Sequence, residues 1–152
     1  MKRKVKELFA EAERTKERLE EMMAKFGDSL TKLLNDEMRV EEHNALSKAV
    51  QSVEKAWKQQ MDIALKTLLR ARREAASKWG ASPYDQYIVK GDVRGRVSSH
   101  LTVDDAIKAA RRDRKRCKHL GAGMYSDVLV YQIDLDGELH VVDEQQYEKQ
   151  EQ

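Results

Sequence analysis

Cysteine is almost absent from this chain, which has one, Cys117, among its 152 residues. A single thiol cannot form an internal disulfide, so a disulfide-rich secreted scaffold is excluded and a reducing compartment is favoured. No apolar run approaches the roughly 20 residues that span a bilayer, and the basic start "MKRKVKELFAEAERTK" lacks the apolar core of a signal peptide. These absences predict a soluble, cytoplasmic protein that has no membrane partner.

Aromatic residues are also few, at 6% of the chain against 37% charged residues. This balance is typical of an elongated helical protein rather than of a compact enzyme with a thick core. The formal net charge is only +2, so the overall charge says little about partners. The distribution of the charges along the chain is the more informative property.

Proline is equally scarce, and the only one, Pro83, divides two regions of different pattern. Before it, apolar residues recur at spacings of three and four that alternate, except for one extra step of four from Trp57 to Met61. This is the pattern of a coiled-coil seam. Two such seams are present, separated by the more polar segment "LLNDEMRVEEHNAL". The first contains Val5, Leu8, Ala12, Thr15, Leu19, Met22 and Phe26, and the second Leu46, Val50, Val53, Trp57, Met61, Ala64, Leu68, Ala71 and Ala75.

The seams predict two long helices, or three, depending on where the chain breaks. Gly27 is a candidate helix stop, with Asp28 or Ser29 capping the next helix. The pair Asn35-Asp36, or Asn44, is a candidate break further along. Helices of this length cannot bury themselves in a small globule, so they must fold as a hairpin, pair with another chain, or both.

Residues 1–80 are therefore predicted to form a helical oligomerisation arm, as a hairpin or coiled coil. Leu65 and Leu69 lie beside the second seam and widen its apolar stripe beyond a simple two-stranded contact. The pattern favours self-association into a dimer or tetramer. A monomer with an intramolecular hairpin is the alternative.

After Pro83 the pattern becomes that of a small α/β domain over residues 84–143. "YDQYIVK" and "VRGRVSS" indicate two short strands, and "LTVDDAIKAARRDRKRCKHLGAG" a helix that begins at Thr102. "YSDVLVYQIDLDGELHVV" indicates a hairpin, and a three-residue loop ending at Gly137 sets Ile133 opposite Leu139. A two-residue turn would mix apolar and polar faces, so the three-residue loop is preferred.

The predicted fold class is α+β: a long N-terminal helical hairpin or coiled coil, then a small antiparallel sheet with one packed helix. The order of elements in the second part is ββαββ or βαββ. The last residues, 144–152, form a polar tail that is expected to fray.

The predicted helix after Thr102 is strongly basic, because seven of the eleven residues from 108 to 118 are Lys or Arg and one, Asp113, is acidic. A helical wheel separates an apolar stripe from a cationic side and places Arg114 inside the stripe. Basic residues also suit the macrodipole at a helix end, but that preference acts over one turn and the cationic side covers about three. Like charges four residues apart repel, and a polyanion would offset this repulsion. The residues predicted here to bind nucleic acid are Lys108, Arg111, Arg112, Lys115, Arg116 and Lys118.

Further cations and rings lie around the predicted strands. A tyrosine that stacks on an unpaired base contributes about 1–3 kcal/mol, although a place in the core or at a strand edge is the alternative for each ring. A second basic cluster, from Arg70 to Lys78, ends the second long helix and is interpreted as a dipole-compensating helix end. The strand-side residues predicted to contact nucleic acid are Lys90, Arg94, Arg96, Tyr87 and Tyr125, and Tyr84 borders the same region.

No motif predicts catalysis or metal binding. Cys117 and His119 are two residues apart on a helix, so their side chains point about 200° apart and cannot share a ligand or a proton. "VEEHN" lacks the Glu three residues before His43 that a di-iron bundle requires, and "GDVRG" lacks the glycine spacing of a P-loop. The chain is predicted not to be an enzyme and to have no cofactor or metal.

In overall plan, a helical oligomerisation arm followed by a small basic α/β unit, the chain resembles small single-stranded DNA-binding proteins of bacterial viruses. The resemblance covers the architecture and no motif, so it assigns no residue a role. It implies a viral transcription cofactor that acts with an RNA polymerase and lacks the usual OB barrel.

These patterns predict a protein that binds single-stranded DNA or RNA with low sequence specificity. Single strands are favoured over duplex because no helix-turn-helix, zinc-finger or basic-zipper pattern is present, and because the basic helix begins with acidic residues. The alternative is a structural or adaptor protein, such as an assembly scaffold, whose basic helix docks on an acidic protein surface.

Overall fold

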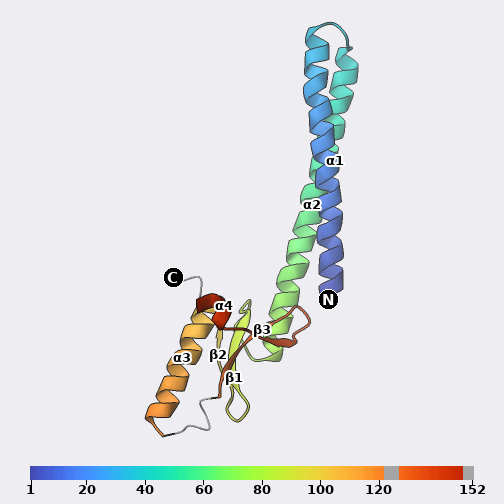
Figure 1. Ribbon diagram of the computed structural model, residues 1–152. Helices are drawn as coiled ribbons and strands as arrows, with labels where there is room; N and C mark the ends of the chain where they lie inside the picture. Colours follow the sequence, from blue (N-terminus) through green and yellow to red (C-terminus); the bar gives the residue numbers. More distant parts are fainter. Residues whose placement is uncertain (122–126, 149–152) are drawn as a thin grey trace. The chain divides into compact units, whose positions relative to one another are not determined.

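The computed structural model describes residues 1–121 and 127–148 (Figure 1). The chain divides into two compact units. The hairpin unit is Arg3–Thr67, and the sheet unit is Met1–Lys2 together with Leu68–Gln152. Long N-terminal helices followed by a small antiparallel sheet and a helix confirm the predicted α+β class.

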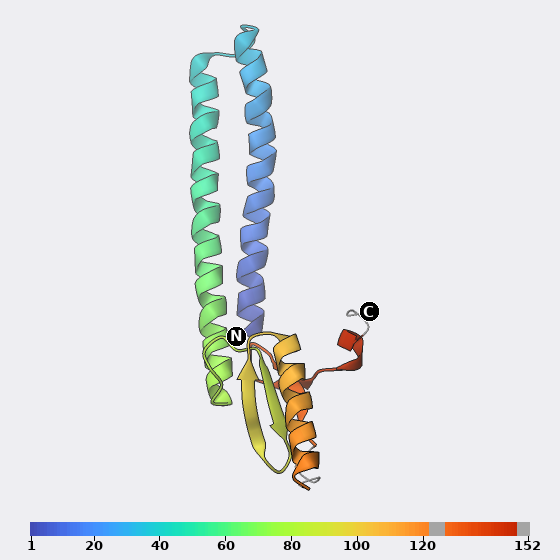
Figure 2. The same ribbon diagram turned by 90° about the vertical axis from the view of Figure 1, so that its left-hand side faces the viewer.

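The hairpin unit is built from helix α1 (Lys2–Leu34) and most of helix α2 (Val40–Lys78), which run antiparallel and side by side (Figures 1 and 2). The predicted seams lie between the two helices. Val5, Ala12 and Leu19 of α1 are buried, while α2 contributes buried Ala64 and the half-buried indole of Trp57. Alternating spacings of three and four keep these residues on one side of each helix, so the two apolar stripes can bury each other.

The predicted helix stop at Gly27 is wrong, because α1 continues without a break to Leu34. Ser29 is a buried member of the seam rather than a cap, and its hydroxyl donates to the carbonyl oxygen of Phe26 at 2.7 Å. The hydroxyl oxygen of Ser29 also lies 2.8 Å from Nδ1 of His43, whose ring stacks on Phe26. One exposed glycine costs a helix only about 1 kcal/mol, which seam contacts on both sides of it outweigh.

The predicted break at Asn35-Asp36 is confirmed, since α1 ends at Leu34 and α2 begins at Val40. Asp36 has φ 56°, in the left-handed region that Asp tolerates better than most residues. Asn44, the alternative break, lies inside α2. The first part of the chain therefore has two long helices and not three.

The described residues of the sheet unit form a sheet of four antiparallel strands in the order β2-β1-β3-β4. Helix α3 (Val103–His119) follows β2, which gives ββαββ, one of the two predicted orders. The predicted register of the last hairpin is confirmed, with Ile133 opposite Leu139 and Gly137 at φ 80°. The strands are β1 (Tyr87–Gly91), β2 (Gly95–His100), β3 (Leu129–Ile133) and β4 (Leu139–Val141).

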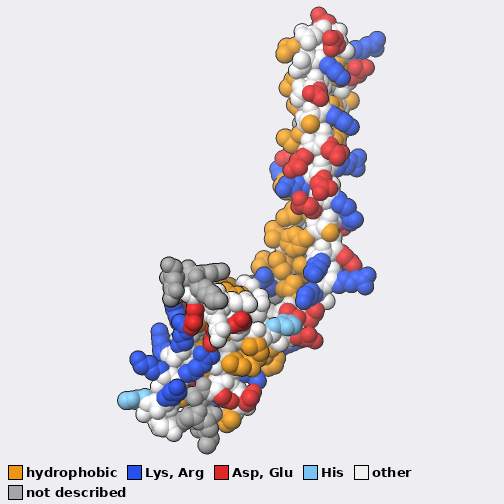
Figure 3. All heavy atoms as spheres, viewed as in Figure 1, with side chains coloured by type: hydrophobic (Ala, Val, Ile, Leu, Met, Phe, Trp, Pro, Cys, Tyr) orange, Lys and Arg blue, Asp and Glu red, His pale blue; other side chains and the backbone are white. Residues whose placement is uncertain are grey.

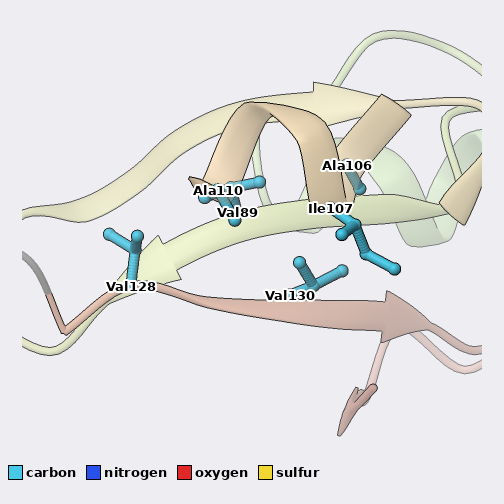
Figure 4. Close-up of a cluster of buried hydrophobic side chains, with 6 residues drawn as sticks. All are labelled: Val89, Ala106, Ile107, Ala110, Val128 and Val130. Carbon is cyan, nitrogen blue, oxygen red and sulfur yellow. The ribbon is translucent and has the colours of Figure 1, made fainter. Parts of the chain in front are cut away.

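Helix α3 covers one face of the sheet and forms the larger core with it (Figure 4). Successive strand residues point to opposite faces, so Val89 and Val130 face α3 whereas Ile88 and Ile133 face away from it. The side chains of this core are Val89, Ala106, Ile107, Ala110, Val128 and Val130.

The opposite face of the sheet is covered by the end of α2, a second helical layer that the sequence pattern did not predict. Ala75 packs there against Ile88 and Ile133, and the indole N–H of Trp79 donates to the carbonyl oxygen of Gly137 at 2.9 Å. The two units accordingly divide inside α2, between Thr67 and Leu68, and not near Pro83, where the sequence pattern changes. The small residues of the last turns of α2 allow a close approach to the strands.

Candidate functional site

Helix α3 positions the basic residues because its N-terminal cap and its buried inner stripe fix its start and its orientation. The hydroxyl oxygen of Thr102 accepts a hydrogen bond from the backbone N–H of Asp105, which confirms the predicted start of the helix. Ala106, Ile107, Ala110 and Cys117 are buried on the inner side. Burial of this stripe turns the remaining side of α3 toward solvent.

The exposed side of α3 carries six of the predicted residues, which we call the basic surface. Figure 3 shows Lys and Arg side chains gathered over this helix. Among the described residues, the ion pairs of the basic surface are limited to one, between Arg111 Nη2 and Glu148 Oε1 at 2.6 Å. The members of the basic surface, all exposed, are Lys108, Arg111, Arg112, Lys115, Arg116 and Lys118.

Two other arginines at α3 are engaged within the fold. Arg114 donates through Nε and Nη2 to the carbonyl oxygen of Val128, at 2.9 and 2.7 Å, and through Nη1 and Nη2 to the carboxylate of Glu144. Arg94, from the turn between β1 and β2, donates to Asp113 at 2.5 Å. Asp113, the single acid in the basic run, therefore pairs with Arg94 and, among the described residues, not with a cation of the basic surface. Arg94 is engaged within the fold through its Nη1.

Lys90 and Arg96 were predicted to join the same surface, but the sheet separates them from it. They lie opposite each other on β1 and β2. Lys90 is two residues from Ile88 and points to the face away from α3, where its ammonium lies 5.8 Å from the ring centroid of Tyr131. These two cations would have to contact a ligand on the other side of the sheet.

Of the tyrosines predicted to stack or to border the site, the structure describes Tyr84 and Tyr87. Tyr87 is half-buried against the core under α3, and this burial raises its pKa above the ordinary value. Tyr87 therefore has the core position that was the alternative to base stacking. Tyr125 lies outside the described residues. Tyr84 is exposed, and it has φ 73° in a turn in which the N–H of Asp85 donates to the carbonyl oxygen of Ser82.

Sequence reasoning missed the contribution of the acidic residues after the sheet. The expected frayed tail is wrong for residues 144–148, because Gln145–Glu148 form the short helix α4 and Tyr147 packs against the core of the sheet unit. Glu144 and Glu148 then reach Arg114 and Arg111 of α3. The available signal was the spacing of four between the two acids with Tyr147 between them, which places both carboxylates on one side of a helical turn.

One cluster of metal-ligand type occurs among the described residues, on the β3–β4 hairpin. Ligand atoms of Asp134, Glu138 and His140 lie within 4.8 Å of one another. The carboxylate of Asp134 already accepts hydrogen bonds from the backbone N–H groups of Asp136 and Glu138, lies 3.0 Å from Nε2 of His140, and has the ammonium of Lys2 nearby. The bond with His140, helped by these N–H groups, lowers the pKa of Asp134 to about 2. These contacts account for the cluster as a set of hydrogen bonds that stabilises the β3–β4 hairpin.

No helix in the described part of the chain combines the length and the apolar character needed to cross a membrane. No protein-family model, curated protein or solved structure matches the chain.

Proposed function

We propose that this protein binds single-stranded nucleic acid, with little sequence preference, through the basic surface of α3. The proposal rests on five cations of this surface that are exposed and unpaired among the described residues. Lys108, Arg112, Lys115, Arg116 and Lys118 are exposed and take part in no ion pair among the described residues.

Electrostatics explains why these cations favour a polyanion. Lys108 and Arg112, and likewise Arg112 and Arg116, are four residues apart on the helix, so each pair repels by a few tenths of a kcal/mol. Phosphates along a nucleic-acid backbone would neutralise the repulsion and release condensed counterions. Stacking by Tyr87 is not part of the proposal, since its ring packs against the core.

Single strands are preferred to duplex because α3 begins with Asp104 and Asp105, so its first turn is unsuited to a major groove. A flexible strand needs only a row of cations to follow. An action together with an RNA polymerase, which the resemblance to viral proteins implies, remains a prediction.

The proposal is tested by fluorescence anisotropy with labelled single- and double-stranded oligonucleotides over a range of salt. Affinity for the single strand should fall linearly in log salt, with a slope of about −0.7 for each phosphate neutralised. The triple variant Arg112→Glu, Lys115→Glu, Arg116→Glu should lose the binding and keep its circular dichroism spectrum. Absence of binding by the wild-type chain at low salt would contradict the proposal.

A matched control uses three exposed basic residues of the hairpin unit. The variant Arg14→Glu, Lys25→Glu, Lys48→Glu changes the net charge by the same amount away from α3. If it weakens binding as much as the α3 variant does, the binding depends on overall charge and not on the basic surface.

A second candidate function, an adaptor that docks on an acidic protein surface, is favoured by the Arg111–Glu148 pair. In this pair, a cation of the basic surface binds a carboxylate. The same titrations separate the two candidates, because an adaptor for acidic proteins would show no preference for single strands over duplex.

A further inference from the structure

The chain's own acidic segment lies against the basic surface. Glu148 pairs with Arg111, and Glu144 pairs with Arg114 at 2.9 and 3.0 Å. Tyr147 packs on the core between the two acids, and together with Arg111 and Glu148 it lines a shallow hollow beside Lys108. Two carboxylates four residues apart thus contact two guanidinium groups three residues apart.

The two ion pairs differ in how easily they can be opened. Arg114 and Glu144 are largely shielded, with side chains 26% and 23% exposed, and Arg114 is also bonded to the carbonyl oxygen of Val128. Arg111 and Glu148 are 47% and 58% exposed, and Arg111 has no other partner among the described residues. The first pair holds the segment in place, whereas the second is an ordinary surface pair that another anion can displace.

A carboxylate and a phosphate group each present two acceptor oxygens that a guanidinium group can bind in the same way. Glu148 and a backbone phosphate therefore compete for Arg111. We propose that the C-terminal segment, residues 143–148, is an autoinhibitory contact that weakens nucleic-acid binding by occupying Arg111. This inference rests on the proposed function, because it concerns regulation of the same surface.

The test measures the affinity of Glu148→Gln for the single-stranded oligonucleotide at low salt. The amide keeps the size of the side chain and removes its charge, so the affinity should rise about two- to five-fold, the range expected for an exposed ion pair. Glu138→Gln is the matched control, because it removes one exposed negative charge from the same unit without touching α3. It should leave the affinity nearly unchanged.

A double-mutant cycle with Arg111→Gln identifies the partner. In the Arg111→Gln background, Glu148→Gln should no longer raise the affinity, since the cation that it frees is gone. If Glu148→Gln still raises the affinity in the Arg111→Gln background, or if Glu138→Gln raises it equally, the effect comes from net charge alone. Either result would overturn the inference.

The outcomes also separate this inference from the function on which it rests. Equal affinities of the wild type and Glu148→Gln would refute autoinhibition and leave nucleic-acid binding intact. Failure of both chains to bind at low salt would refute the proposed function, and autoinhibition with it.

Discussion

Arg112 and Arg114 lie two residues apart on α3, yet their guanidinium groups have different surroundings. Arg112 is exposed and has no ion pair among the described residues, whereas Arg114 is bonded to Glu144 and to the carbonyl oxygen of Val128. The sequence predicted this difference in part, because a helical wheel places Arg114 in the apolar stripe. The identity of its partners could not be predicted, since they lie 14 and 30 residues away along the chain.

Arg114→Ala should lower the free energy of unfolding of the sheet unit. The substitution leaves the carbonyl oxygen of Val128 and the carboxylate of Glu144 without their donor, which costs roughly 1–3 kcal/mol. Arg112→Ala removes an exposed side chain and should change the same quantity by no more than about 0.5 kcal/mol. Urea unfolding of both variants measures the difference. Equal stabilities would show that the Arg114 bonds contribute nothing to the fold.

At the scale of elements, the structure confirms the predictions that depend on short-range sequence patterns. The start of α3 at Thr102 follows from a cap within one turn, and the β3–β4 register from the alternation of apolar residues around Gly137. The predicted stop at Gly27 is wrong because the seam contacts on either side of it outweigh the low helix propensity of one glycine. The layer formed by the end of α2 depends on packing between distant segments, which periodicity does not report.

Gly27→Ala should stabilise the hairpin unit. Gly27 lies inside α1, is exposed, and an added Cβ would meet no atom within 4 Å. Alanine restricts the unfolded chain and suits a helix, so the free energy of unfolding should rise by about 0.4–1 kcal/mol. Thermal unfolding followed by circular dichroism at 222 nm is the measurement. A lower melting temperature would mean that the chain needs the freedom of glycine at this point.

At the scale of the whole molecule, the sequence predicted the class of fold and the basic surface but not the surroundings of that surface. Six cations of α3 are exposed as expected because helical periodicity decides their side. Lys90 and Arg96 lie on the other face of the sheet, and Arg94 is bonded to Asp113. These placements depend on strand register and long-range ion pairs, so linear proximity to the basic run was a poor guide.

Self-association through the hairpin unit remains a proposal, and it has a direct test. Leu65 is 46% exposed on α2, although leucine favours burial. If copies pair through this side of the helix, Leu65→Lys should shift the oligomer toward monomer in sedimentation velocity experiments. Gln59→Lys adds the same charge at another exposed position of α2 and should not. A wild-type chain that sediments as a monomer at all concentrations would contradict self-association.

The two tryptophans of the chain are divided between its units. Trp57 belongs to the seam of the hairpin unit, and Trp79 bonds to Gly137 in the sheet unit. Replacing either one by phenylalanine leaves a single tryptophan, whose emission, excited at wavelengths that tyrosine does not absorb, reports the melting of one unit without a tryptophan signal from the other. The molecule thus carries its own pair of optical probes, and comparing the two denaturation curves would reveal whether the units unfold together or in sequence.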